Sequence, residues 1–348
     1  MKTKYSAYYR PRQEELKEAS ETALFVFDTN CLLDILRISP ELAKKTLGCI
    51  EKYKERIRIP AHVDREYHKH LFEIPAQVLA VAENKKETFS FSLIEKPIRE
   101  HFEKSGTGCQ FPSDRLEKYI SDFRETFDKT VTEMDKLVGY YRNNFESHAM
   151  QARISDLLKG LILPDFTPEE VAEIKEEGKD RYEQRIPPGY MDSSKATETD
   201  DNNQYGDLIV WKEILRLAEA EKKHIFFICR DVKEDWIAKI AGKTLGPRIE
   251  LIVEFKEKAP GCIFHIYTLT QFLKHFGENF STTELASFPR IRRIRVTANS
   301  LSTPKSAASR YFMPGIRKGY RLKNTIQSDS DGDEGNSKSY AEDNAQDN

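Results

Sequence analysis

Four acidic residues lie close to apolar segments of this sequence: Asp28, Glu66, Asp207 and Asp231. Asp28 directly follows the apolar run 24–27, and Asp231 comes two residues after a second apolar run at 224–229. Carboxylates held close together repel one another, which raises their pKa values and favours binding of a hard divalent cation such as Mg²⁺ or Mn²⁺. Such a cation can activate water for attack on a phosphodiester and stabilise the departing oxygen.

Each acid also has a structural interpretation, because Asp, Thr and Asn commonly cap helix N-termini. Asp28, Thr29 and Asn30 precede an apolar, helix-like pattern, so this stretch alone favours a capped helix. Open parallel sheets, however, place their sites at the carboxyl ends of the strands, and each of the four acids lies at a strand end or at a helix start. We therefore predict a shared acidic site, with Thr29 or Asn30 still capping a helix from Cys31. Asp34 is expected to lie behind this site or at the surface.

The elements that must position these acids alternate between strands and helices. Apolar and alternating patterns predict strands at 24–27, 56–60, 224–229 and 262–269. Helical periodicity predicts helices within 32–53, after residue 62, and at 206–223, 230–242, 249–258 and 270–277. This alternation predicts an α/β fold in which helices flank a parallel sheet. Glu66 and Asp207, at helix starts, would lie at the same sheet edge as Asp28 and Asp231.

A large helical insertion interrupts the α/β pattern. Almost no strand signal occurs at about 71–185, where 113–145 forms a long amphipathic pattern. A second helix is expected after Thr167, because Pro168 and Glu170 complete a capping box. We divide the chain into an N-terminal extension (1–20), an α/β domain (21–283) that contains the insertion, and a tail (284–348) that is basic, then acidic, and largely disordered.

Composition narrows the class of protein. The chain has 348 residues and a net charge of −2, so no global basic field indicates nucleic acid. Its five cysteines are odd in number and form no CxxC pair, which argues against a disulfide scaffold or a cysteine-rich zinc site. Cys31 and Cys229 are expected to be buried free thiols. We find neither a signal-peptide pattern nor a membrane-spanning apolar run, and predict a cytoplasmic protein.

Five sequence segments together resemble the PIN-domain superfamily of nucleases, in its PIN-like branch with a long helical insertion. They are FDTNCLLDIL, IPAHVDREY, IPPGYMD, YGDLIVW and FICRDVKEDW, and the resemblance covers about 24–273. It implies a Mg²⁺- or Mn²⁺-dependent nuclease that acts mostly on single-stranded RNA. The implied metal ligands are Asp28, Glu66, Asp207 and Asp231, with Asp235 as a further candidate.

The same resemblance assigns supporting roles. Asn30 is the implied polar helper of Asp28, and Thr29 is a candidate for orienting it. Cys229 stands where many relatives have threonine, so it cannot supply a hydroxyl there. Trp236 is expected to pack in the core.

Other polar residues near these segments are weaker candidates for substrate or metal binding. Arg230 and Arg185 are candidates for binding substrate phosphate, and Asp192 follows Arg185 in a Pro- and Gly-containing loop. His62, Glu66 and His70, spaced four residues apart, share one helical face that could bind zinc, but no further Cys or His partner is evident.

The sequence thus favours a metal-dependent endoribonuclease that uses a metal-activated water. A DNA nuclease of the flap type and a catalytically inactive RNA-binding module are the alternatives. Nucleic acid is the expected partner, RNA rather than DNA, and a homo-oligomer or a regulatory partner is left open. The basic, aromatic segment 288–323 is expected to contact nucleic acid, because cations meet phosphates and aromatic rings stack on unpaired bases.

Overall fold

The computed structural model describes residues 5–103, 111–195, 202–230 and 233–289. Asp231 and the basic and acidic parts of the tail therefore lie outside the described residues. No described helix is both long enough and apolar enough to cross a membrane.

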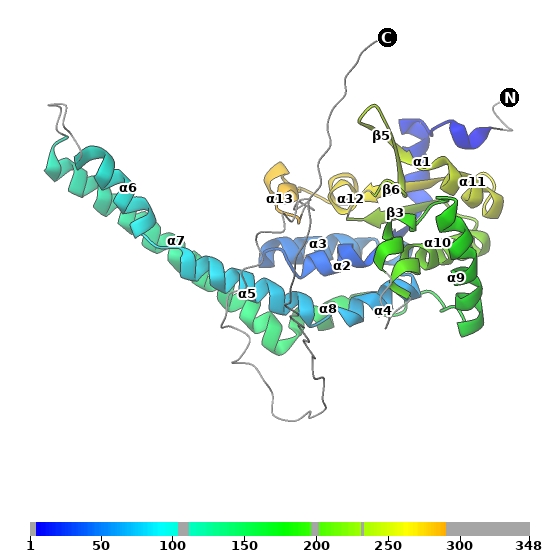
Figure 1. Cartoon of the computed structure of the whole chain (residues 1–348), viewed down its shortest axis with the longest axis horizontal. Helices are drawn as coiled ribbons and strands as arrows, with labels where there is room; N and C mark the ends of the chain where they lie inside the picture. The colour runs from blue at the N-terminus through cyan, green and yellow to red at the C-terminus, as the bar shows by residue number, and fades with distance from the viewer. Residues whose placement is uncertain (1–4, 104–110, 196–201, 231–232, 290–348) are drawn as a thin grey trace, which may run out of the picture. The chain divides into compact units, whose positions relative to one another are not determined.

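A four-stranded parallel sheet forms the centre of the fold (Figure 1). Its strands, in spatial order, are β2 (Ile57–Arg58), β1 (Leu24–Phe27), β3 (Ile225–Cys229) and β6 (Phe264–Thr268). The two central strands, β1 and β3, are buried along their whole length, as expected for strands covered by helices on both faces. The predicted α/β fold with a parallel sheet is confirmed.

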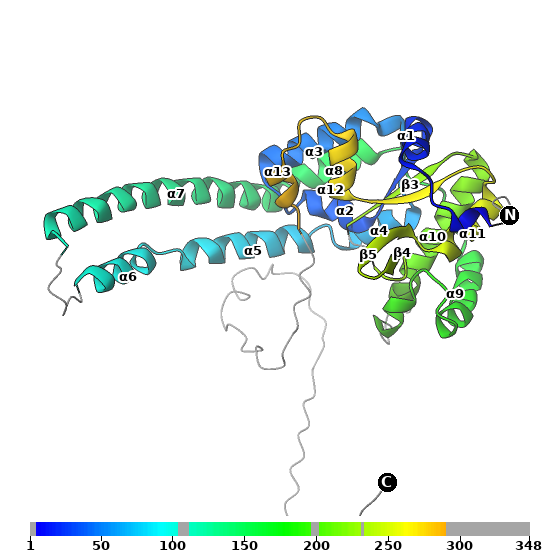
Figure 2. The same cartoon turned by 90° about the horizontal axis from the view of Figure 1, so that it is seen from above.

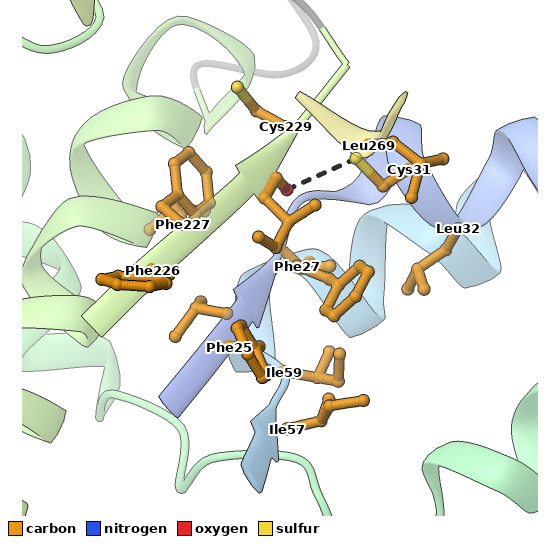
Figure 3. Close-up of a cluster of buried hydrophobic side chains, with 14 of the residues drawn as sticks. Phe25, Phe27, Cys31, Leu32, Ile57, Ile59, Phe226, Phe227, Cys229 and Leu269 are labelled. Carbon is orange, nitrogen blue, oxygen red and sulfur yellow. Dashed lines mark hydrogen bonds between the residues drawn. The ribbon is translucent and has the colours of Figure 1, made fainter. Parts of the chain in front are cut away.

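The sheet positions two strand ends side by side. Phe27 of β1 pairs with Ile228 of β3, and the Asp28 amide donates to the Ile228 carbonyl at 2.9 Å. Phenylalanines of both strands pack into the core below this edge (Figure 3), where the Phe25 ring lies 5.1 Å from that of Phe272. The Cys31 thiol also donates to the Ile228 carbonyl, at 3.3 Å. The start of the helix after β1 is therefore tied to the end of β3.

Helices and short 3₁₀ turns (η) surround the sheet. They are η1 (Ser6–Tyr8), α1 (Gln13–Thr22), α2 (Thr29–Ile35), α3 (Pro40–Lys52), η2 (Lys54–Arg56), α4 (Ala61–Lys69), η3 (Tyr190–Lys195), α10 (Asn202–Glu221), α11 (Ile249–Lys258), α12 (Leu269–Phe276) and α13 (Thr282–Ala286). Helix α10 contacts α4, α9, α11 and η3, whereas α12 contacts α3, β3 and β6. Helix α4, which carries Glu66, thus contacts both α2, which follows Asp28, and α10, which carries Asp207.

The predicted insertion is helical throughout its described part. It contains α5 (Glu73–Thr88), α6 (Ser92–Glu103), α7 (Ser113–Ser147), α8 (Ala149–Leu158) and α9 (Pro168–Glu183). Helices α5 and α6 run alongside the long helix α7 as a hairpin that extends away from the sheet (Figures 1 and 2). The predicted capping box of α9 is present: Thr167 Oγ1 accepts from the Glu170 amide at 3.2 Å, and Glu170 Oε2 accepts from the Thr167 amide at 2.7 Å.

Two local predictions need correction. The helix expected at 230–242 is wrong, because this region forms β4 (Ile237–Ile240), which pairs with β5 (Lys243–Pro247) in an antiparallel hairpin. Ala241 and Gly242 have φ of 50° and 75°, the left-handed conformation that two-residue hairpin turns require. The strand expected at 56–60 is shorter than predicted, since only two residues of it pair with β1.

Candidate active site

Asp28 occupies the N-cap position of α2 but does not cap it. The helix begins at Thr29, and no side-chain capping hydrogen bond is made by Asp28. The expectation that Thr29 or Asn30 caps a helix from Cys31 is therefore wrong. The Asp28 carboxylate instead accepts a hydrogen bond from Asn30 Nδ2 at 3.3 Å. No backbone amide of α2 caps onto this carboxylate, so its oxygens are available to another partner.

Thr29 connects α2 to the second acid. Its hydroxyl is buried, 1% exposed, and donates to Glu66 Oε2 at 2.5 Å. Glu66 lies in the second turn of α4 and is exposed to solvent. A buried threonine that donates to an exposed carboxylate orients this carboxylate relative to α2. Thr29 thus acts on Glu66, whereas the sequence suggested that it orients Asn30.

Asp207 lies on α10 and is already engaged by two donors. Lys233 Nζ is 2.7 Å from Asp207 Oδ2, and Trp236 Nε1 donates to the same oxygen at 3.3 Å. The Trp236 ring also stacks on Phe227, with centroids 4.8 Å apart, so its predicted packing role is confirmed. Lys233 makes a second contact of 2.7 Å, to Asp192 Oδ2.

Asp235 is the most buried of these acids, with 0% of its surface exposed. Its Oδ2 accepts from the amides of Gly189 at 2.9 Å and Met191 at 3.4 Å, so it holds the loop that leads into η3. Its Oδ1 is buried and has no hydrogen-bond partner among the described residues. A buried oxygen without a donor is costly, and an absent water or cation is an ordinary explanation for it.

The electrostatics of the site show that neighbouring acids act on Asp28 and on Asp235. Burial, together with the charges of Glu66 and Asp207, raises the pKa of Asp28 to about 7, against the lowering effects of Asn30 and Lys233. Burial and the charge of Asp207 likewise raise the pKa of Asp235, although the loop amides oppose this shift. The fold therefore holds more negative charge here than the protein itself neutralises.

The donor set fits a hard divalent cation. Asp28 has a pKa raised by burial and by neighbouring carboxylates, and the Oδ1 atom of Asp235 is buried without a donor. Both features favour an oxygen-ligated cation such as Mg²⁺. In their present positions, however, no three His, Cys, Asp or Glu side chains among the described residues are grouped to hold one ion. Asp207 is held by Lys233, and Glu66 is held by Thr29.

The zinc hypothesis gains no support from the described residues. His70 lies just beyond α4, and its Nδ1 is 2.8 Å from Glu73 Oε2. The His62 imidazole packs against α10, where a Cβ at Gly206 would lie 2.9 Å from His62 Nε2. Burial lowers the pKa of His62, which keeps the ring neutral at the point where α4 and α10 approach each other closely.

The two arginines predicted to bind phosphate differ in their surroundings. Arg230 donates through Nε to Asp34 Oδ2 at 2.8 Å, and Arg37 is 3.1 Å from Asp34 Oδ1. Asp34 is only 1% exposed, so a surface position for it is wrong. Burial raises its pKa, which both arginines oppose. Arg185 is exposed just after α9 and has a φ of 54°.

Sequence reasoning missed Lys233, the cation in the middle of the acids. Nothing in the local pattern separates it from the many solvent-exposed lysines of the chain. Its only sequence signal is its position two residues after Asp231 and two before Asp235. Asp192, by contrast, was a candidate, and the structure brings it to Lys233.

A parallel sheet with acids at the carboxyl ends of its strands defines a class of α/β proteins that act at this edge. The model of the family described as the PIN-like domain matches residues 24–251, which include β1, β3 and the insertion between them. The chain belongs to the PIN-like domain family, whose fold is generally that of a nuclease. No curated protein and no solved structure matches the chain.

Proposed function

We propose that this protein is a metal-dependent endonuclease that hydrolyses phosphodiester bonds in single-stranded RNA. The observation that carries this proposal is the state of Asp28. It sits at the end of a buried strand, makes no capping bond, and has a pKa raised to about 7 by burial and by Glu66 and Asp207. A buried carboxylate that serves only structure is neutralised by cations, as Asp34 is by Arg230 and Arg37.

The residues take the following roles in this proposal. Asp28, Glu66, Asp207 and Asp231 hold the cation, and Asp235 contributes its Oδ1, which has no donor among the described residues. When bound, Mg²⁺ or Mn²⁺ lowers the pKa of water and stabilises the negative charge on the departing oxygen.

The neighbouring side chains prepare these ligands. Asn30 orients the Asp28 carboxylate through its 3.3 Å hydrogen bond, and Thr29 orients Glu66. Trp236 directs an N–H at Asp207, which fixes one oxygen of this ligand.

The substrate contacts rest on charge and exposure. Arg185 is exposed and is our candidate for contacting phosphate. Arg230, the second candidate, is held by Asp34, and it would reach phosphate only if this ion pair opened. RNA is favoured over DNA because most PIN nucleases that the sequence resembles cut RNA. A cytoplasmic location is in keeping with buried thiols at Cys31 and Cys229.

Cleavage assays on the full chain test this function. Wild type, Asp28→Asn and the control Asp122→Asn, an exposed acid of α7, are incubated with Mn²⁺ and single-stranded RNA, single-stranded DNA or a branched duplex. We expect wild type and the control to cut RNA internally. We expect Asp28→Asn to lose at least ~10²-fold in rate, because one ligand of the cation is lost.

Each alternative has its own outcome in these assays. Preferential cleavage of branched duplex would identify a flap-type DNA nuclease. RNA binding without turnover at saturating Mn²⁺ would identify an inactive binding module. Cleavage by Asp28→Asn at the rate of wild type would show that the site is assigned wrongly.

A further inference from the structure

Lys233 joins two carboxylates that come from different elements. Its Nζ lies 2.7 Å from Asp207 Oδ2 on α10 and 2.7 Å from Asp192 Oδ2 on η3. The lysine side chain is 35% exposed, whereas those of Asp192 and Asp207 are 13% and 24% exposed. The ammonium is therefore partly open to solvent, and the acids that it joins are more buried.

This contact occupies an oxygen of Asp207, one of the proposed metal ligands. Asp207 Oδ2 receives both the ammonium and the Trp236 indole N–H, so its lone pairs are directed at donors. A divalent cation at the same oxygen would also face the full positive charge of Lys233 at short range. The ammonium and the cation therefore compete for Asp207.

Asp192 can keep the Lys233 ammonium paired after it leaves Asp207. The backbone of Asp192 is fixed, since its amide donates to the Gly189 carbonyl at 2.9 Å. If Lys233 leaves Asp207, its ammonium stays paired with Asp192, and no charge is left buried without a partner. Only a small side-chain movement is needed, because both carboxylates already touch the same nitrogen.

We propose that Lys233 is the counter-ion of the metal-free site. When a divalent cation binds, Lys233 releases Asp207 and keeps its contact with Asp192, and this exchange sets the metal affinity of the site. This inference rests on the proposed function, because it takes Asp207 as a metal ligand. It explains why the described acids are not grouped around one point, since Asp207 is turned to Lys233.

Mn²⁺ binding to the full chain, measured by isothermal titration calorimetry without substrate, tests the inference. The variants are Lys233→Met, Asp192→Asn, the double variant, and Lys239→Met as a control that removes an exposed lysine of β4. We expect Lys233→Met to bind Mn²⁺ about 10-fold more tightly, because the competing charge is gone. The control should bind as wild type does.

The double variant separates two roles of Asp192. If Asp192 acts by receiving Lys233, Asp192→Asn weakens Mn²⁺ binding in the wild-type background and has little effect once Lys233 is replaced. An equal loss in both backgrounds would make Asp192 a metal ligand and would overturn the proposal.

Other results also decide the question. An unchanged or weaker Mn²⁺ affinity of Lys233→Met overturns the inference, as does a failure of both this variant and wild type to bind Mn²⁺. If Lys233→Met does not fold, Lys233→Gln replaces it. Tighter binding by Lys233→Met without RNA cleavage by any variant would support the inference and refute the proposed function. Cleavage that depends on Asp28, with equal Mn²⁺ affinities, would do the reverse.

Discussion

Single residues in this site are defined by what their side chains face. Asp28 has the sequence position of a helix cap, but among the described residues its carboxylate accepts a hydrogen bond from the Asn30 side-chain amide and caps nothing. Asp34 is six residues further on and has the same chemical group, yet two arginines neutralise it in the interior. Asp28 therefore has mainly acidic neighbours, whereas Asp34 has basic ones. Two aspartates six residues apart therefore have different electrostatic surroundings.

The raised pKa of Asp28 makes the stability of the metal-free protein depend on pH. With a pKa of about 7, Asp28 keeps its proton in the native state up to about that pH, whereas the unfolded chain releases it near the ordinary aspartate pKa of 3.8. Between these values the native state binds more protons, so the free energy of unfolding falls as pH rises. We expect Asp28→Asn to be more stable than wild type by about 1–3 kcal/mol at pH 8, and by much less near pH 4.

Thermal unfolding in the presence of a chelator, at a series of pH values, measures this difference. Asp122→Asn should follow the wild-type curve, because its carboxylate is exposed on α7. A constant difference between Asp28→Asn and wild type across the pH range would show that Asp28 is not buried among like charges.

Secondary-structure elements bring the acids together by their order in the fold. Strands β1 and β3 are neighbours, so the chain segments that follow them begin at one edge. Helices α4 and α10 approach closely at Gly206, which brings the helices of Glu66 and Asp207 against each other. The loop that leads into η3 is the third segment at this edge of the sheet. Asp235 accepts hydrogen bonds from the amides of Gly189 and Met191 there.

Gly189 is the point in this loop where a side chain cannot be accepted. Its φ is 95°, and a Cβ would overlap the Tyr182 hydroxyl and lie 3.3 Å from Asp207 Cβ. Gly160 has a similar φ of 79° but nothing within 4 Å of a Cβ, so it serves as the control. We expect Gly160→Ala to cost about 1 kcal/mol through backbone strain alone, and Gly189→Ala about 2–3 kcal/mol or more.

Urea unfolding of both variants measures these costs. Equal losses would show that Tyr182 moves aside freely, and that the loop does not need glycine for its packing.

At the scale of the whole molecule, the active-site edge is assembled from distant parts of the chain. Strand β3 follows β1 only after the long helical insertion, which extends from the sheet as a hairpin. Helices α6 and α7 of this insertion carry none of the proposed ligand residues. Phe288, 4% exposed, packs in the core, so the folded part reaches nearly to the end of the described residues.

The segment that follows Pro289 is strongly basic, because it has ten Lys and Arg residues and no acid before Asp329. We expect a chain ending at residue 289 to melt as the full chain does but to bind single-stranded RNA about 10-fold more weakly at low salt, with a smaller salt dependence, because fewer counter-ions are released. A chain ending at residue 328, which loses only the acidic end, should bind RNA at least as tightly as the full chain. Equal affinities and salt slopes for all three would exclude a role of the tail in RNA binding.

The sequence by itself determined the α/β class, the strands 24–27 and 224–229 and the capping box at Thr167. These features are local, since they follow from apolar periodicity and from the chemistry of neighbouring residues. The β4–β5 hairpin was missed because a short apolar segment such as IAKI suits a strand or a helix, and two left-handed turn residues decided it.

Only the tertiary structure decided which charges meet. Lys233 lies 26 residues from Asp207 in the chain, and Arg230 lies 196 residues from Asp34. Neither pair has a sequence signature, because an ion pair requires only that two side chains end near one point, and long-range packing chooses that point. The structure thus shows that arginines neutralise Asp34, whereas Asp28 has carboxylates as neighbours. It also shows Lys233 beside Asp207, where the sequence predicted only a metal ion.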